Sequence, residues 1–384
     1  MGLGHGAAVF ALCCGSLRCK PPGPPTSALA HRVAETYTSG LSSWESPPQD
    51  AGQRYRGKSG NSPGRTLTDW ACDVTGCKQV PQVVGDDSSE RAAPRWPGTG
   101  DNSAVPSNDF NALFAVLDTD PERYVVDEPN VFPSAIGRSF YGSVLPPGHV
   151  HLRWSAYAAV WLSRLPMPIP GHFFIPRAMG TVRAEFDRQG AQDWEAFLSL
   201  RATELRPGGR LVVVLPALDD AGSSVFHALM DHANAVLANM VDEGAILADE
   251  RGRMVLGSYP RRRRDLLAPF VNGGQFHQLV VEYCDTSVVS DVAWADYERH
   301  GDKEALATTH ARFFRSTFAP SLATALTRAR DAGACRAFAD RLEDGLKRRL
   351  VNLPAPLHHL VGTIALAKQP DTSDHIREVS ANQN

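Results

Sequence analysis

The stretch TVRAEFDRQGAQDWEAFLSLRATELRPGGRLVVVL, residues 181–215, decides the fold. Its first part carries apolar residues at helical spacing, among them Phe186 and Trp194, and it predicts a helix over 181–205. The PGG at 207–209 predicts a tight turn. The LVVVL that follows is a continuous apolar run, as in a strand covered on both faces. A helix, a tight turn and a buried strand in this order are typical of a doubly wound α/β domain.

Further elements continue this pattern on both sides. A small-residue turn precedes a strand predicted at 149–154. The aromatic spacing after this strand predicts a helix over 155–164, which PMPIP then ends. Asn108 or Asp109 is a candidate N-cap for an earlier helix. The later predicted helices lie at 224–240, 261–270, 305–330 with a break at Pro320, and 335–349. Strands are predicted at 275–283 and 357–367, and a strand or turn at 254–259.

Composition narrows the class of protein. The chain has 384 residues, is 43% hydrophobic and carries a net charge of −3, which allows one large domain or two ordinary ones and gives no indication of nucleic-acid binding. The basic run Arg261 to Arg264 is interpreted as a solvated surface loop. No apolar run reaches the roughly 18 to 20 residues of a membrane helix. We therefore expect a cytoplasmic protein without a membrane partner.

Cysteine and histidine do not indicate a metal site. The seven cysteines are irregularly spaced, and the thirteen histidines are dispersed without an HExxH. The N-terminal run AAVFALCCGSL has the length of a signal-peptide core, but no Lys or Arg precedes it. A secreted protein is therefore a minor hypothesis.

Residues 1–104 differ in composition from the rest of the chain. Gly, Pro and Ser make up roughly a third of them, and turn formers interrupt the few apolar residues every few positions. We interpret this segment as low-complexity, either a disordered extension or out-of-frame sequence. Residues 105–384 are predicted to form one domain, with helical insertions at about 218–270 and 290–350.

Familiar motifs of competing enzymes are missing from the sequence. GxSxG, the phosphate-binding P-loop and HExxH do not occur, and no GxGxxG opens a strand-helix-strand unit. PGGRLVVV, with a long helix before it and a helix-rich insertion after it, favours a nucleoside-binding methyltransferase among doubly wound proteins.

Four motifs in order carry a family resemblance: NDFNALF, SFYGSVLPP, WSAYAAVWLSRLP and FLSLRATELRPGGRLVVV. Together they resemble the plant salicylate, jasmonate and caffeine-type (SABATH) methyltransferases and their bacterial relatives, over Val105 to about Lys368. The resemblance implies methyl transfer from S-adenosylmethionine (SAM) to a carboxylate, or a related O or N nucleophile, of a small molecule. It also implies a Rossmann-like class I methyltransferase sheet with an α-helical cap, here incomplete at its N-terminal half, and commonly a homodimer.

The resemblance also implies the site residues. Ser139 and Phe140 would lie beside the cofactor, although Phe140 equally suits a core position. Tyr157, Val160 and Trp161 would line the acceptor pocket, with the Trp161 indole N–H donated to the acceptor carboxylate. No catalytic acid or base is expected, because a carboxylate is already ionised at neutral pH. Orientation of the reacting atoms can supply roughly 7 to 11 kcal/mol of the barrier.

Residues 1–104 leave a second hypothesis open. The family's Gly-rich Asp-x-Gly loop has no counterpart there, and Ala104-Val105-Pro106 stands where the family carries an acidic residue near the adenosine. The alternative to an active enzyme is therefore a catalytically inactive methyltransferase remnant that lacks the cofactor-binding loop.

Overall fold

The computed structural model describes residues 136, 138–224, 226–329 and 331–370, together with the backbone of two short strands, β1 (Phe10–Ala11) and β2 (Val83–Asp87). The helix predicted after Asn108 or Asp109 lies outside the described residues. None of the described helices is long and apolar enough to cross a membrane.

The described strands form one mixed sheet in the order β1-β2-β3-β4-β7-β6-β5. Its centre is parallel, since β2, β3 (Val150–Ala156) and β4 (Leu205–Pro216) run in one direction. β7 (His359–Lys368) is antiparallel to β4 and to β6 (Leu279–Val289), and β5 (Gln275–Phe276) pairs with β6. β3, β4 and β6 therefore end at the edge where β7 begins, and the predicted α/β class is confirmed.

The centre of the sheet is apolar because it is buried. Leu211, Val213 and Leu215 of β4 are inaccessible to solvent. Leu211 lies opposite Leu366 of β7, and Val213 lies opposite Ile364, so one face of the sheet presents a continuous aliphatic surface. The predicted buried strand is confirmed, and the PGG segment belongs to its N-terminal part.

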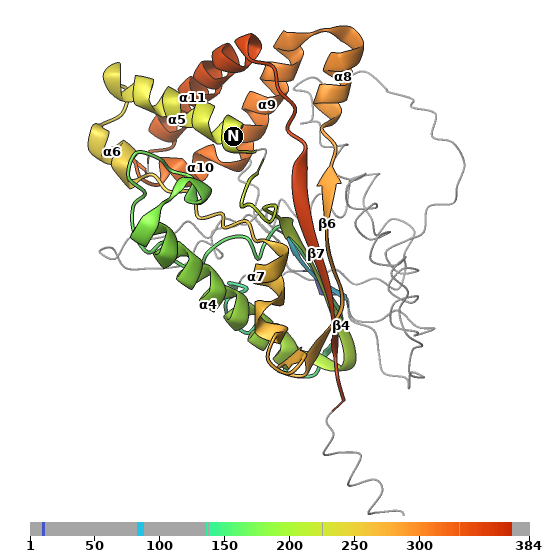
Figure 1. Cartoon of the computed structure of the whole chain (residues 1–384). Helices are drawn as coiled ribbons and strands as arrows, with labels where there is room; N and C mark the ends of the chain where they lie inside the picture. The colour runs from blue at the N-terminus through green and yellow to red at the C-terminus, as the bar shows by residue number, and fades with distance from the viewer. Residues whose placement is uncertain are drawn as a thin grey trace, which may run out of the picture.

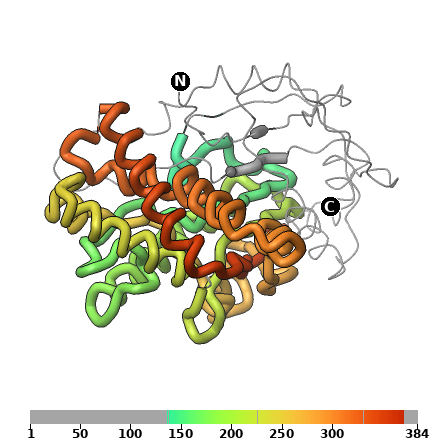
Figure 2. Tube along the Cα trace, turned by 90° about the horizontal axis from the view of Figure 1, so that it is seen from above, coloured from blue at the N-terminus to red at the C-terminus, as the bar shows by residue number. Residues whose placement is uncertain are grey.

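Helices cover one face of this sheet and its upper end (Figure 1). α4 (Gly180–Glu204) and α7 (Arg263–Leu267, continued by a 3-10 turn at Ala268–Phe270) lie beside the strands. The other helices form a cap beyond the end of β6, in which α11 lies between α5 and α9 (Figure 2). The cap helices are α5 (Phe226–Asp242), α6 (Ala248–Arg253), α8 (Val292–His300), α9 (Lys303–Thr317), α10 (Ala319–Ala323) and α11 (Ala332–Asn352).

The helix predicted at 155–164 is wrong. β3 continues to Ala156, and a chain of turns follows it. Tyr157 has a φ of 56°, which no α-helix contains. Trp161 pairs with Ser258 as in a sheet, so the aromatic residues after β3 reach the interior from successive turns.

The prediction of a solvated surface loop at Arg261 to Arg264 is wrong for the first of these residues. Arg261 is 1% exposed, whereas Arg263 and Arg264 are exposed at the start of α7. The Arg261 guanidinium donates to the Gly190 carbonyl at 2.7 Å and lies over the rings of Trp194 and Tyr259. Aromatic faces thus provide the cation with a favourable buried environment.

Within residues 1–104, β2 takes a place in the sheet next to β3. Val83 pairs with Leu152, and Asp87 pairs with Ala156. Apart from β1 and β2, this segment lies outside the described residues, and the division of the chain at residue 104 stays a prediction.

Candidate functional site

The predicted acceptor residues lie directly after β3, at the edge where β3 and β4 end and β7 begins. Ligands of open α/β sheets bind outside the carboxyl ends of the strands. The cap stands over this same edge (Figure 1), so the site would lie between sheet and cap.

Tyr157 is held at the point where the chain leaves the sheet. Its backbone N–H donates to the Val214 carbonyl at 2.7 Å, which fixes the left-handed conformation. Its hydroxyl shares a hydrogen bond of 2.8 Å with Nε2 of His359, the first residue of β7. Burial lowers the pKa of His359, so its imidazole is neutral at pH 7. The Phe226 ring of α5 lies 5.3 Å from His359 and brings the cap to the same point.

Val160 and Trp161 are both buried. Val160 is 2% exposed and belongs to the main hydrophobic core, and its carbonyl accepts from the Tyr259 N–H at 2.8 Å. Trp161 is 6% exposed, and its backbone N–H donates to the Ala158 carbonyl. Its indole Nε1 has no hydrogen-bond partner among the residues that the structure describes. An unsatisfied buried N–H is costly, at about 1 to 3 kcal/mol.

The two predicted cofactor residues differ in their exposure to solvent. Ser139 is exposed, and its Oγ accepts the Tyr141 N–H at 3.2 Å. Phe140 is buried in the main core, where its ring meets the edge of Phe197 at 6.2 Å. The Phe140 side chain therefore has the core position that the sequence left open, and Ser139 is the polar group available to a ligand.

Tyr141, which the sequence did not single out, connects the predicted cofactor residues to the predicted acceptor residues. Its hydroxyl donates to the Trp161 carbonyl at 2.6 Å. Burial, with the nearby charge of Asp193, raises the pKa of Tyr141, so the hydroxyl keeps its proton. The segment that carries Ser139 is thus connected directly to the segment that carries Trp161.

A buried ionic cluster supports the segment around Tyr141. Glu204, the last residue of α4, binds Arg153 at 2.6 Å and Arg201 at 2.9 Å, and all three side chains are at most 1% exposed. Arg201 donates to the carbonyls of Phe140 and Gly142, at 3.0 and 2.8 Å. The spacing of Arg201 and Glu204, three residues apart on an otherwise apolar helix face, was a usable sequence signal for this cluster.

A buried hydroxyl without a partner among the described residues lies at the same edge of the sheet. The register puts Asp86 opposite Ser155 and Asp87 opposite Ala156, so two acidic positions stand at the carboxyl end of β2. Ser155 is fully buried, and its Oγ has no hydrogen-bond partner within the described part of the chain. The Ser155 hydroxyl can donate to or accept from a bound ligand.

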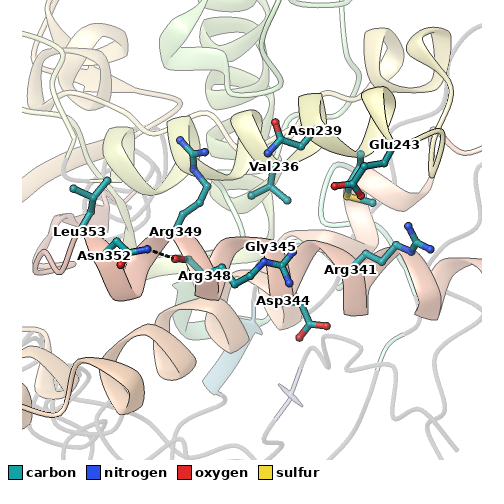
Figure 3. Close-up of a pocket in the computed structure, with 11 residues that line it drawn as sticks. Val236, Asn239, Glu243, Arg341, Asp344, Gly345, Arg348, Arg349, Asn352 and Leu353 are labelled. Carbon is teal, nitrogen blue, oxygen red and sulfur yellow. Dashed lines mark hydrogen bonds between the residues drawn. The ribbon is translucent and has the colours of Figure 1, made fainter.

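A separate polar groove lies between α5 and α11 (Figure 3). Its volume is about 470 Å³, and Arg341, Arg348 and Arg349 of α11 line it together with Asn239 of α5. None of the five predicted site residues contributes to this groove. No cluster of three metal-ligating side chains occurs among the described residues.

Residues 103–357 match the model of a family described as SAM-dependent carboxyl methyltransferases. The chain belongs to this family. It is 27% identical over 204 residues to salicylate carboxymethyltransferase of Clarkia breweri, covering 52% of this chain and 54% of the relative. It is 28% identical over 205 residues to gibberellic acid methyltransferase 2 of Arabidopsis thaliana, covering 47% and 52%. The chain thus spans about half the length of the curated relatives it matches.

Among solved structures, a loganic acid methyltransferase with SAH is similar at 20% identity and a TM-score of 0.49, covering 69% of this chain and 72% of that one. The family match confirms the predicted resemblance to the SABATH methyltransferases and identifies SAM as the family's cofactor.

Proposed function

We propose that this chain transfers a methyl group from SAM to the carboxylate of a small organic molecule. The buried indole N–H of Trp161 is the observation that carries the proposal, because its Nε1 lacks a hydrogen-bond partner among the described residues. A carboxylate oxygen is an acceptor that would satisfy this donor, and hydrogen bonds to charged groups contribute about 1.5 to 3 kcal/mol.

The residues around Trp161 suit an acceptor that needs no general base. Trp161 would hold one carboxylate oxygen and leave the other free to attack. His359, neutral at pH 7, and Tyr157 would form an uncharged wall that does not repel the anion. SAM, beside the Ser139 hydroxyl, would supply a methyl group on its sulfonium sulfur. The acceptor oxygen would take this methyl as the sulfur–methyl bond breaks, which would give a methyl ester and S-adenosylhomocysteine (SAH).

Ser139, Phe140 and Val160 would contact the cofactor or shape the pocket in this proposal. The exposed Ser139 hydroxyl would contact the cofactor, and Phe140 would anchor the segment that carries it to the core. Val160 would contribute apolar wall. A small-molecule acceptor, a cytoplasmic location and a homodimer complete the proposal.

Cofactor binding is the first test. We expect SAH to give a calorimetric binding signal and to raise the melting temperature, because a ligand that binds only the folded state stabilises it. Methyl-labelled SAM should then label salicylate or gibberellic acid, the acceptors named for two relatives. Absence of any SAH signal at millimolar concentration would favour the inactive remnant instead.

Trp161→Phe tests the acceptor contact, since it removes the N–H and keeps an aromatic ring. We expect the acceptor KM to rise tenfold or more, with the Kd of SAH changed less than twofold. Trp194→Phe is the matched control, because Nε1 of the buried Trp194 already donates to the Leu266 carbonyl at 3.1 Å. This control should lower stability and leave the acceptor KM unchanged; equal effects of the two variants on KM would count against the contact.

A further inference from the structure

We propose that Tyr141 is a positioning residue for Trp161: its hydroxyl holds the Trp161 carbonyl and thereby sets the direction in which the indole N–H points. The inference rests on the proposed function, because it assigns Trp161 to the acceptor. It extends that function to a residue that contacts neither acceptor nor cofactor in the proposal.

The backbone around Trp161 is held from several sides, and Tyr141 provides one of these contacts. Val160 and Leu162 form hydrogen bonds with the backbone of Tyr259 and Gly257, at 2.8 and 2.9 Å. These bonds fix the neighbours of Trp161 and leave its own carbonyl to another donor. Among the described residues, Tyr141 donates the hydrogen bond to that carbonyl, at 2.6 Å.

Tyr141 is itself held rigidly. The carbonyls on both sides of it, those of Phe140 and Gly142, accept hydrogen bonds from the Arg201 guanidinium. Glu204 binds Arg201 and also accepts the Val144 N–H at 2.8 Å. A continuous path therefore runs from the C-terminal end of α4 through Arg201 and Tyr141 to the Trp161 carbonyl.

The direction of the indole matters because a hydrogen bond weakens steeply when its geometry departs from linearity. The Nε1 of Trp161 has no second partner among the described residues that could correct its orientation. Loosening the Trp161 carbonyl should therefore weaken acceptor binding and leave the cofactor largely unaffected. Loss of one neutral hydrogen bond corresponds to a change of about threefold to tenfold.

Tyr141→Phe removes the hydroxyl and keeps the ring, and Tyr259→Phe is its matched control. The Tyr259 hydroxyl donates to Asp187 of α4 at 2.7 Å, so this variant also loses one tyrosine hydrogen bond but leaves the Trp161 carbonyl held. For both variants and the wild type, we would measure the Kd of salicylate in the presence of SAH and the Kd of SAH by calorimetry. The exchange rate of the Trp161 indole proton would be measured by NMR, with the resonance assigned from Trp161→Phe.

Tyr141→Phe should raise the Kd of salicylate threefold to tenfold and accelerate exchange of the Trp161 indole proton, with the Kd of SAH within twofold of wild type. Tyr259→Phe should leave both Kd values and the indole exchange rate unchanged. Unchanged indole exchange in Tyr141→Phe, or equal acceleration in both variants, would overturn the proposal. Failure of the wild type to bind SAH would instead overturn the proposed function, and the exchange rates would still decide the role of Tyr141.

Discussion

Of the four consecutive arginines at 261–264, the first is buried in the core and the last two are exposed to solvent. The first, Arg261, is buried against Trp194 and Tyr259 and donates to the Gly190 carbonyl. Burial lowers the pKa of its guanidinium, yet arginine keeps its charge at neutral pH. A charge run alone cannot reveal this, because Trp194 and the Gly190 carbonyl come from α4, about 70 residues earlier in the sequence.

The arginine run provides a matched pair of substitutions. Arg261→Ala removes a buried hydrogen bond and leaves a cavity between two rings, so we expect a loss of about 3 kcal/mol in the free energy of unfolding. Arg264→Ala, at an exposed position of the same run, should change it by less than about 0.5 kcal/mol. Urea unfolding followed by circular dichroism measures both; equal losses would contradict the buried role of Arg261.

The sequence proposed residues of the candidate site only where a motif carried them. Trp161 and Ser139 stand in motifs that the sequence displays, and the structure brings their segments together. Tyr141 and Glu204 stand in these motifs too, but their partners, like those of Arg153 and His359, could not be assigned from a motif. Their roles depend on hydrogen bonds that span up to 202 residues, and those follow from packing of the sheet rather than from local pattern.

At the level of elements, Asp291 connects two helices of the cap, α8 and α9, to the sheet. It caps α8 by accepting the Trp294 N–H, and it pairs with His310 of α9 at 2.9 Å. It also accepts the Leu357 N–H at 2.8 Å, just before β7 begins. Burial alone would raise the pKa of Asp291, but these hydrogen bonds outweigh it, and the pKa lies below its usual value.

Asp291→Asn should destabilise the protein by about 2 to 3 kcal/mol at neutral pH, because an amide cannot replace all the bonds to the carboxylate. A lowered folded-state pKa means that this stabilisation is complete above the usual value near 4 and is lost as the pH falls through the folded-state value. The difference between wild type and variant in urea unfolding should therefore shrink below about pH 4.

Asp302→Asn is the control for this measurement. Asp302 caps α9 through one exposed hydrogen bond to Ala305, and Asn is an equally good N-cap. We expect a change below about 0.5 kcal/mol. A difference for Asp291→Asn that stayed constant down to pH 2 would mean that the carboxylate charge is not what stabilises the cap.

The accuracy of the element predictions followed the strength of the local signal. α4 and β4 were predictable because a helical segment of 25 residues is followed by an aliphatic run, although the turn predicted at 207–209 lies within β4. The helix at 155–164 was wrong because aromatic residues on successive turns imitate helical spacing. The left-handed Tyr157 ends the strand there, and no residue type in the sequence indicates that conformation.

Across the whole molecule, the Arg153–Glu204–Arg201 cluster joins the sheet, the helical layer and the candidate site. Arg153 belongs to β3, and Arg201 and Glu204 end α4. Arg201 and Glu204 also bind the segment between Phe140 and Leu145. Family motifs could predict β3, α4 and the segment that carries Tyr141. The connection between them depends on the buried guanidinium groups of Arg153 and Arg201, which share the Glu204 carboxylate.

Glu204→Gln should therefore affect all three parts together. Removing one partner from a buried ionic cluster costs about 3 to 5 kcal/mol, because the remaining charges stay buried without compensation. Guanidinium unfolding should show this loss, and hydrogen exchange should rise in β3, at the end of α4 and in residues 140–145 together. Glu343→Gln is the control: Glu343 is 23% exposed and bridges α11 to Arg315 of α9, and its loss should cost at most about 1 kcal/mol. Faster exchange confined to the end of α4 would mean that the cluster stabilises the helix alone and does not connect the sheet to the site.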